Sequence, residues 1–251
     1  MAAVTALWRH PIKSHGREAL EQVMLSAGQT MPWDRHWAVT HEATKFDTNA
    51  PAWTSCRNFM IGSQNPGVAG IWSAFDEISG TITLRHANLA DISFQPGTSA
   101  GEAAFLAWAT PLYEVDKRTP TKIVSAGARG MTDSPEPTIS IMTKASHLAV
   151  EKEMGHDLDV ARWRGNVWLD GPAAWEEFDW IGHDIRIGNA VLHVTDPIKR
   201  CMATAASPTT GQRDLDTLGA LRDGWDHQNF GVYAKVITSG TIALGDTYEV
   251  L

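Results

Sequence analysis

The chain has 251 residues, of which 43% are hydrophobic and 20% are charged, a composition typical of a globular protein that folds without disulfides or metal. Its formal net charge of −8 argues against a general nucleic-acid or anionic-membrane partner, because such partners attract basic surfaces. Two cysteines are too few for a disulfide framework and fit a reducing compartment, and no apolar run is long enough to span a membrane. The N-terminus lacks the pattern of a signal peptide, so we expect a cytoplasmic protein.

Alternating apolar residues bounded by turn signals predict short strands along most of the chain. In chain order these strands are expected at residues 4–9, 18–25, 37–41, 71–76, 81–86, 138–142, 166–170, 183–187, 190–195, 230–238, 241–244 and 247–250. Ser79-Gly80 and Gly188-Asn189 are typical of hairpin turns between neighbouring strands. Residues 44–70 contain prolines and several glycines and are expected to be largely irregular.

Helices are expected at residues 100–112, at residues 144–154 and shortly after residue 214. The side chains expected to cap their N-termini are, in the same order, Ser99, Thr143 and Asp214. Glu102 has the spacing that completes a capping box with Ser99, and Gly155 is expected to end the second helix.

The balance of these elements predicts a mainly β protein of the α+β type, because strands dominate and no strand–helix–strand unit is repeated. Residues 113–137 are rich in proline and glycine. We expect a domain boundary there, with one domain at residues 1–115 and a second at residues 116–251. The alternative is that the same stretch is a mobile loop within one unit.

Cys201 directly follows Lys199 and Arg200, and Pro197 precedes them. Neighbouring positive charge favours the thiolate, which is the form that binds metals and attacks electrophiles. Because proline presets the backbone, the segment is expected to present its thiol from a defined turn. The alternative for such an isolated cysteine is a small buried apolar side chain.

Three further loops carry cations, around Lys13, Arg35 and Arg164. Taken singly, each could be a solvated loop or half of an ion pair. Together, in an acidic protein, they could surround the Cys201 thiol with positive charge. The guest that such a cleft implies has phosphate-like oxygens at one end and a thiophilic metal at the other.

Other motifs carry less information. No dinucleotide fingerprint or P-loop is present, and neither cysteine has a second one nearby, which excludes the usual zinc-ribbon and iron–sulfur spacings. His183 and His193 could meet across a hairpin as metal ligands, with ordinary surface or core placement as the alternative. Four aromatic residues are candidate pocket walls, with core packing as the alternative: Trp33, Trp37, Trp163 and Phe230.

Several motifs, in order, resemble the MOSC family, which is named for the C-terminal domain of molybdenum cofactor sulfurase. The segments that carry the resemblance are 197–204 (PIKRCMAT), 208–214 (PTTGQRD), 230–234 (FGVYA), 240–246 (GTIALGD), 162–166 (RWRGN) and 143–146 (TKAS). Residues 10–14 (HPIKS) and 34–37 (DRHW) resemble the companion N-terminal domain. The resemblance implies a β-barrel MOSC domain with a few short helices, preceded by an N-terminal β-barrel-like domain.

Members of the family's amidoxime-reducing group bind a pyranopterin-dithiolene molybdenum cofactor and reduce N-hydroxylated compounds. The resemblance implies that Cys201 is the catalytic thiolate and the protein's ligand to molybdenum. The side chains it implies for holding the molybdenum cofactor are Lys13, Ser14, Arg35, Ser146, Arg164, Asn166, Lys199 and Arg200. The last two would also lower the pKa of the thiol. The resemblance also implies pyridoxal phosphate binding, as a property associated with the family as a whole.

The function implied by the resemblance is a molybdenum-dependent oxidoreductase that reduces N–O or S–O bonds of small molecules. Some relatives carry a C-terminal ferredoxin domain, whereas this chain ends at Leu251. We therefore expect a separate electron-donor protein of the ferredoxin, flavodoxin or cytochrome type. Two alternatives remain: a carrier of the cofactor or of a persulfide without turnover, and a binding module that keeps only an anion pocket.

Overall fold

The computed structural model describes residues 2–125, 127 and 129–251. Within these ranges it contains fifteen strands and three α-helices, which confirms the mainly β prediction. Residues 126 and 128 of the stretch expected to be irregular, and Met1 of the expected N-terminal segment, lie outside the described residues. No helix in the described ranges is long and apolar enough to cross a membrane.

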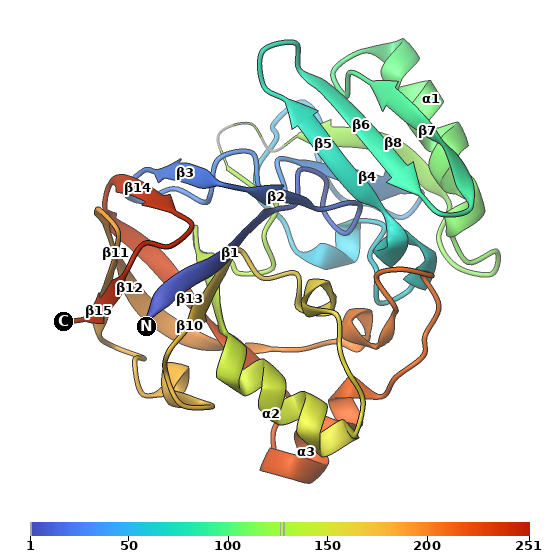
Figure 1. Ribbon diagram of the computed structural model, residues 1–251. Helices are drawn as coiled ribbons and strands as arrows, with labels where there is room; N and C mark the ends of the chain where they lie inside the picture. The colour runs from blue at the N-terminus through green and yellow to red at the C-terminus, as the bar shows by residue number, and fades with distance from the viewer. Residues whose placement is uncertain (1, 126, 128) are drawn as a thin grey trace.

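The largest sheet takes strands from both ends of the chain (Figure 1). In spatial order it contains β15 (Tyr248–Val250), β11 (Asp184–Ile187), β12 (Ala190–Lys199), β13 (Asn229–Thr238), β9 (Ile139–Thr143), β10 (Val167–Asp170), β1 (Ala3–Arg9) and β2 (Glu18–Leu20). Neighbours run antiparallel except β9 and β10, which are parallel and are connected through a helix, as a parallel pair requires.

Backbone hydrogen bonds bring the two edges of this sheet together around one apolar core. β3 (Gln22–Leu25) pairs with β14 (Gly240–Ala243). The Val4 amide donates to the Asp246 carbonyl at 2.9 Å, and the Gly245 amide donates to the Val4 carbonyl at 2.9 Å. Buried Leu, Ile and Val side chains from both halves of the chain fill the interior. The first strands of the chain therefore share the core of the second half.

A second group of strands, formed by the N-terminal half and β8, packs around its own core (Figure 1). β4 (Trp37–His41) pairs with β8 (Pro120–Ser125), and α1 (Ser99–Ala109) lies beside a three-stranded meander. The meander consists of β5 (Trp72–Asp76), β6 (Thr81–His86) and β7 (Leu89–Phe94). Along β6, Ile82 and Leu84 are buried while their sequence neighbours are not, which is the alternation of a strand with one face on a core.

Two helices, α2 (Lys144–Met154) and α3 (Thr217–Trp225), pack against each other at one end of the molecule (Figure 1). The Thr143 side chain accepts a hydrogen bond from the Ser146 amide, and Gly155 ends α2 in the left-handed conformation, as predicted. Short 3-10 turns complete the structure at Cys56–Asn58, Pro66–Gly70, Thr110–Leu112, Val160–Trp163, Glu176–Phe178 and Met202–Ala205.

The predicted cap of the first helix was wrong by one residue. Thr98, not Ser99, is the N-cap of α1, and its hydroxyl accepts from the Gly101 amide at 3.0 Å. Glu102 does not complete a capping box, because its carboxylate accepts from the Ile123 amide at 3.1 Å on the neighbouring strand. A long-range contact has replaced the local one that the sequence spacing suggested.

The predicted cap of α3 was also wrong. Asp216 caps the helix by accepting from the Gly219 amide at 2.8 Å. Asp214 instead forms an ion pair with Arg162, with 2.7 Å between Oδ2 and Nη2. Both aspartates are chemically able to cap a helix, and the position of Arg162 decides between them.

Two strands were missed and one was predicted too short. β7 follows β6 after a tight turn, and β8 lies in the stretch expected to be irregular, where its pairing with β4 makes it a strand. β12 continues through Pro197 to Lys199, with irregular register on both sides of the proline. These irregularities accommodate a residue that cannot donate to the ladder.

Candidate functional site

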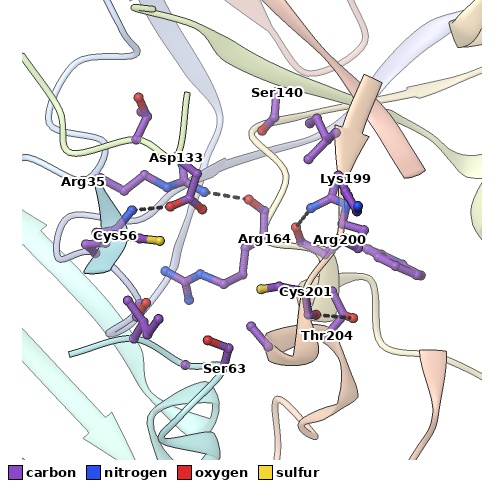
Figure 2. Close-up of a pocket in the computed structure, with 18 of the residues that line it drawn as sticks. Arg35, Cys56, Ser63, Asp133, Ser140, Arg164, Lys199, Arg200, Cys201 and Thr204 are labelled. Atoms are coloured by element: carbon purple, nitrogen blue, oxygen red, sulfur yellow. Dashed lines mark hydrogen bonds and ion pairs between the residues drawn. The ribbon is translucent and has the colours of Figure 1, made fainter. Parts of the chain in front are cut away.

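A cavity of about 310 Å³ lies between the loops after β1 and β4 on one side and the ends of β9, β12 and β13 on the other (Figure 2). This volume is within the range of small-molecule pockets in proteins. Among the described residues, six cationic side chains and one carboxylate line it: Lys13, Arg35, Arg162, Arg164, Lys199, Arg200 and Asp133. The protein as a whole carries a net charge of −8, so the excess of cations in this cavity is opposite in sign to the net charge of the chain.

Cys201 stands at the wall of this cavity, directly after β12. It is the N-cap of the 3-10 turn Met202–Ala205, and its carbonyl accepts from the Thr204 amide at 3.2 Å and the Thr204 hydroxyl at 3.1 Å. The residue is exposed, and its sulfur faces the open centre of the pocket in Figure 2. The alternative of a buried apolar cysteine therefore does not hold at this position.

Arg200 fixes the segment that carries Cys201. Its Nε and Nη1 donate to the carbonyls of Phe230 and Trp163, both at 2.8 Å, and its backbone amide donates to the Gln228 carbonyl at 2.8 Å. Burial lowers the pKa of Arg200 to about 10, since no carboxylate of the described chain forms an ion pair with it. The guanidinium thus joins three segments of the cavity wall through carbonyl dipoles.

Three polar side chains of the cavity stand on strained backbone. Ser14, Arg35 and Arg164 have left-handed conformations, with φ of 65°, 52° and 49°. For non-glycine residues this conformation costs about 1 kcal/mol each, and such strain gathers at functional sites. Around Ser14, a bridge between Ile12 and His15 closes the tight turn that holds it.

Arg35 connects the two halves of the molecule at the cavity. Its Nη2 donates to the Arg164 carbonyl at 2.9 Å, and its Nη1 forms an ion pair with Asp34. The buried Asp34 also accepts from the His10 amide at 2.8 Å. Burial alone would raise the pKa of Asp34, but Arg35 and His10 hold it far below its ordinary value, so this carboxylate stays charged and orients the guanidinium.

Arg164 holds a buried charge without an ion-pair partner among the described residues. Its Nη2 donates to the Gly16 carbonyl at 3.2 Å, and no ion pair with a described carboxylate forms. Burial, together with the neighbouring charges of Arg35 and Arg17, lowers its pKa to about 9. An anion entering the cavity would reverse this shift, because it would supply the missing opposite charge.

Lys13 is paired across the cavity wall with Asp133. The buried ammonium donates to the Asp133 carboxylate at 2.5 Å and to the Met131 carbonyl at 2.8 Å. The cations of Lys13, Arg35 and Arg164 lower the pKa of the largely exposed Asp133 carboxylate. The Asp133 carboxylate therefore already pairs with an ammonium that an anionic guest could otherwise bind.

The structure brings most of the predicted site residues together. The cavity is lined by Lys13, Ser14, Arg35, Arg164, Asn166, Lys199, Arg200 and Cys201. The Asn166 side chain hydrogen-bonds to Ser140 and to the Trp8 carbonyl, so it stabilises the wall of the cavity. Lys199 is exposed at the rim, whereas Arg200 is bound to carbonyls.

Ser146 does not line the cavity, in contrast to the prediction. It lies in the first turn of α2, where its buried hydroxyl donates to the Glu177 carboxylate at 2.8 Å and accepts from the Trp175 amide at 2.7 Å. The hydroxyl therefore both donates and accepts hydrogen bonds within the protein, and its donor is not available to a ligand. The serine therefore belongs to the helix N-terminus in this structure.

Of the aromatic and histidine candidates, one lines the cavity and the others lie elsewhere. Trp163 lines the cavity and stacks on Phe230 with 3.8 Å between ring centroids, whereas Trp33 and Trp37 pack in the core of the N-terminal half. His193 faces Asp184 across the hairpin, at 2.7 Å from Nδ1 to Oδ1, and not His183. In the part of the chain that the structure describes, no cluster of three potential metal-ligating His, Cys, Asp or Glu side chains occurs.

Three functional candidates in the cavity wall were missed: Cys56, Asp133 and Tyr233. Cys56 faces the open pocket from the wall opposite Cys201 (Figure 2), and burial and the Asp133 carboxylate raise the pKa of its thiol. Cys56 lies in a short 3-10 turn and Asp133 in an irregular segment, and neither belongs to a motif, so no local signal marks them. Tyr233 lies in the recognised segment 230–234, where alternation along a strand could have pointed to it.

The fold and this site define a known class of protein. The pattern of the MOSC domain matches residues 128–249, and that of the MOSC N-terminal beta barrel domain matches residues 1–109. The chain belongs to the MOSC family and contains both of these parts.

Two relatives illustrate the similarity. Mitochondrial amidoxime reducing component 2 from Homo sapiens is 30% identical over 118 residues, which cover 42% of this chain and 35% of that protein. The match thus spans about a third of the human protein's length. The YUAD protein from Bacillus subtilis shares the fold, with a TM-score of 0.50 and 13% identity over 100% of this chain and 96% of that one.

Proposed function

We propose that this protein is an oxidoreductase that binds the molybdenum cofactor and reduces N-hydroxylated or related N- or S-oxygenated small molecules. The observation that carries the proposal is the thiol of Cys201 at the edge of a cavity lined by six cations and one carboxylate. The similarity to an amidoxime reducing component supports the same class of reaction.

The polar groups of the cavity fit an anionic, oxygen-rich group. The guanidinium of Arg164 lacks an ion-pair partner among the described residues, and Asp133 is the carboxylate that a phosphate would have to replace at Lys13. The hydroxyl of Thr138, also in the wall, is buried without a hydrogen-bond partner in the described structure. Buried polar groups normally have partners, so these groups are suited to a guest.

In the proposed complex, Cys201 would supply the thiolate to molybdenum, and Lys13, Arg35 and Arg164 would hold the phosphate and pterin oxygens. Arginine suits this task because its planar fork donates two hydrogen bonds at once. Arg200 would hold the Cys201 segment through its carbonyl contacts. When bound, the cofactor supplies the two-electron chemistry at a metal with soft sulfur ligands.

The electrons would come from a separate donor protein of the ferredoxin, flavodoxin or cytochrome type. The exposed Cys201 and the exposed rim residue Lys199 leave the cavity open on one side for a donor or a substrate. Both cysteines are free, which fits a reducing compartment. We therefore propose a cytoplasmic location.

The test is molybdenum per chain, measured by elemental mass spectrometry on protein from a host that makes the cofactor. We expect near-stoichiometric metal in the wild type and a sharp loss in Cys201→Ala. Cys56→Ala removes the other thiol of the same cavity and should retain the metal. Equal metal in all three proteins would contradict the assignment of Cys201, and a metal-free wild type would contradict the proposed function.

A carrier of the cofactor or of a persulfide is the second candidate, and the exposure of the Cys201 thiol favours it. A carrier must give its cargo to a partner, which requires an accessible sulfur. Stoichiometric cofactor without reduction of any N-oxygenated compound, in the presence of a reduced donor, would support this alternative over the oxidoreductase.

A further inference from the structure

Reduction of an N–O bond consumes protons as well as electrons. For a hydroxylamine-type substrate, R–NH–OH + 2 e⁻ + 2 H⁺ gives R–NH2 + H2O, so the N–O bond breaks and the oxygen leaves as water. The electrons come from the donor protein. A side chain that faces the cavity and is protonated at neutral pH would speed the reaction by giving a proton to the leaving oxygen.

Few groups of the cavity can fill this role. No histidine within the described ranges lines the cavity, and the pKa of Asp133 is lowered, so this carboxylate has no proton to give. Each arginine of the cavity wall donates to a carboxylate or a backbone carbonyl, and the Lys13 ammonium is bound by Asp133 and the Met131 carbonyl. Lys199 is exposed to solvent at the rim. The phenol of Tyr233 and the thiol of Cys56 remain.

The position of Tyr233 in the sheet turns its side chain toward the cavity. It pairs with Ser140 of β9 and with Asp196 of β12, and β12 leads directly into Cys201. Opposed residues of an antiparallel pair project to the same face, and both Tyr233 and Ser140 line the cavity. Cys56, in contrast, lies on the side of Asp133, opposite Cys201 (Figure 2).

The hydroxyl of Tyr233 is free to meet a guest. The neighbouring Ser140 hydroxyl donates to Asn166 at 2.8 Å, whereas in the described structure the Tyr233 hydroxyl makes no hydrogen bond. Half-buried tyrosine hydroxyls normally find a partner. Burial and the Asp133 carboxylate raise the pKa of Tyr233, so the phenol keeps its proton at neutral pH.

We propose that Tyr233 is a catalytic residue that donates its phenolic proton to the oxygen leaving the substrate; this inference rests on the proposed function. The proton passes from Oη to the substrate oxygen as the N–O bond breaks, and water leaves. The phenolate, next to Arg200 and Arg35, then takes a proton from solvent through the open side of the cavity.

The experiment compares wild type, Tyr233→Phe and Tyr248→Phe with an aromatic amidoxime as substrate and reduced methyl viologen as donor. Molybdenum per chain is measured on the same samples. Tyr233→Phe should contain as much metal as wild type, with kcat lowered about 100-fold and KM changed by less than about threefold. Tyr248 lies on β15, outside the cavity, so its variant should keep the wild-type rate.

A second readout does not depend on turnover. In partly reduced protein, the electron paramagnetic resonance signal of molybdenum should show coupling to an exchangeable proton in water. The coupling should weaken in Tyr233→Phe, and in wild type transferred to deuterium oxide it should disappear. A coupling of the same strength in Tyr233→Phe as in wild type would overturn the assignment.

The remaining outcomes are distinct. A fully metallated Tyr233→Phe with the wild-type rate overturns this inference and leaves the proposed function intact. Loss of metal from Tyr233→Phe makes the tyrosine a holder of the cofactor and also overturns it. A fall in kcat in Cys56→Ser, with Tyr233→Phe unaffected, moves the donor to the thiol. A metal-free wild type removes the proposed function together with the reaction this donor would serve.

Discussion

At the scale of single residues, the ion pair between Lys13 and Asp133 controls the charge that an anion meets in the cavity. Asp133→Asn removes the carboxylate that now binds the ammonium at 2.5 Å. We expect inorganic phosphate to bind the metal-free variant roughly fivefold to tenfold more tightly, because one competing charge, worth about 1 kcal/mol, is gone. Isothermal titration calorimetry at low ionic strength measures the change.

Glu136→Gln is the matched control, since it removes a carboxylate nearby in the chain that pairs with Lys235 at 3.1 Å and does not line the cavity. Equal gains in affinity for the two variants would show a general effect of net charge. The role assigned to Asp133 would then be wrong.

Arg200 is expected to be needed for its shape as well as for its charge. Arg200→Lys keeps a cation but loses the fork that joins the carbonyls of Phe230 and Trp163. We expect the free energy of unfolding to fall by about 2 kcal/mol, the value of hydrogen bonds from a charged donor in a buried setting. Lys199→Arg, at the exposed neighbour, should stay within about 0.5 kcal/mol of wild type. Urea unfolding of both variants tests this, and similar small changes would contradict it.

At the scale of elements, the buried carboxyl group of Glu177 hydrogen-bonds to the N-terminus of α2. Glu177 accepts from the hydroxyls of Thr143 and Ser146, and its Oε1 has no partner in the described structure. Burial raises the pKa of Glu177 above its ordinary value of 4.5. The folded state therefore binds this proton more tightly than the unfolded state does.

The sign of the pH dependence follows from that shift. The contribution of Glu177 to stability is fully present below about pH 4.5 and is lost as the pH rises through the higher pKa of the folded state. Glu177→Gln should flatten the fall in stability above pH 4.5, as measured by thermal unfolding at a series of pH values. Glu153→Gln, at an exposed position of α2, should keep the wild-type profile, and an unchanged profile for Glu177→Gln would refute the idea.

At the scale of the whole molecule, the two halves share a sheet. β1 pairs with β10, and β3 pairs with β14, so a piece that begins at residue 116 would lack β1, β2 and β3 and expose the edges they cover. We predict one cooperative transition for the full chain, seen together by tryptophan fluorescence and circular dichroism. Residues 116–251 alone should give no cooperative transition. Two separate transitions in the full chain would favour independent domains at residues 1–115 and 116–251.

The sequence alone determined the features that depend on neighbouring residues. The two-residue turn at Gly188-Asn189 and the start of α2 at Thr143 follow from local backbone preferences and hydrogen bonds. The cysteine after two cations and the ordered motifs around it were enough to indicate the family. The predominance of strands followed from alternation along the chain.

The tertiary structure alone decided which of these residues meet. β8 became a strand because β4, about 80 residues earlier, pairs with it, and Ser146 turned inward because Glu177 accepts a hydrogen bond from its hydroxyl. Asp133 and Tyr233 reached the cavity of Cys201 through strand pairing and loop packing. Periodicity and caps act over a few residues, whereas pairing partners, buried charges and cavity walls depend on contacts between distant segments, and these exist only after the chain has folded.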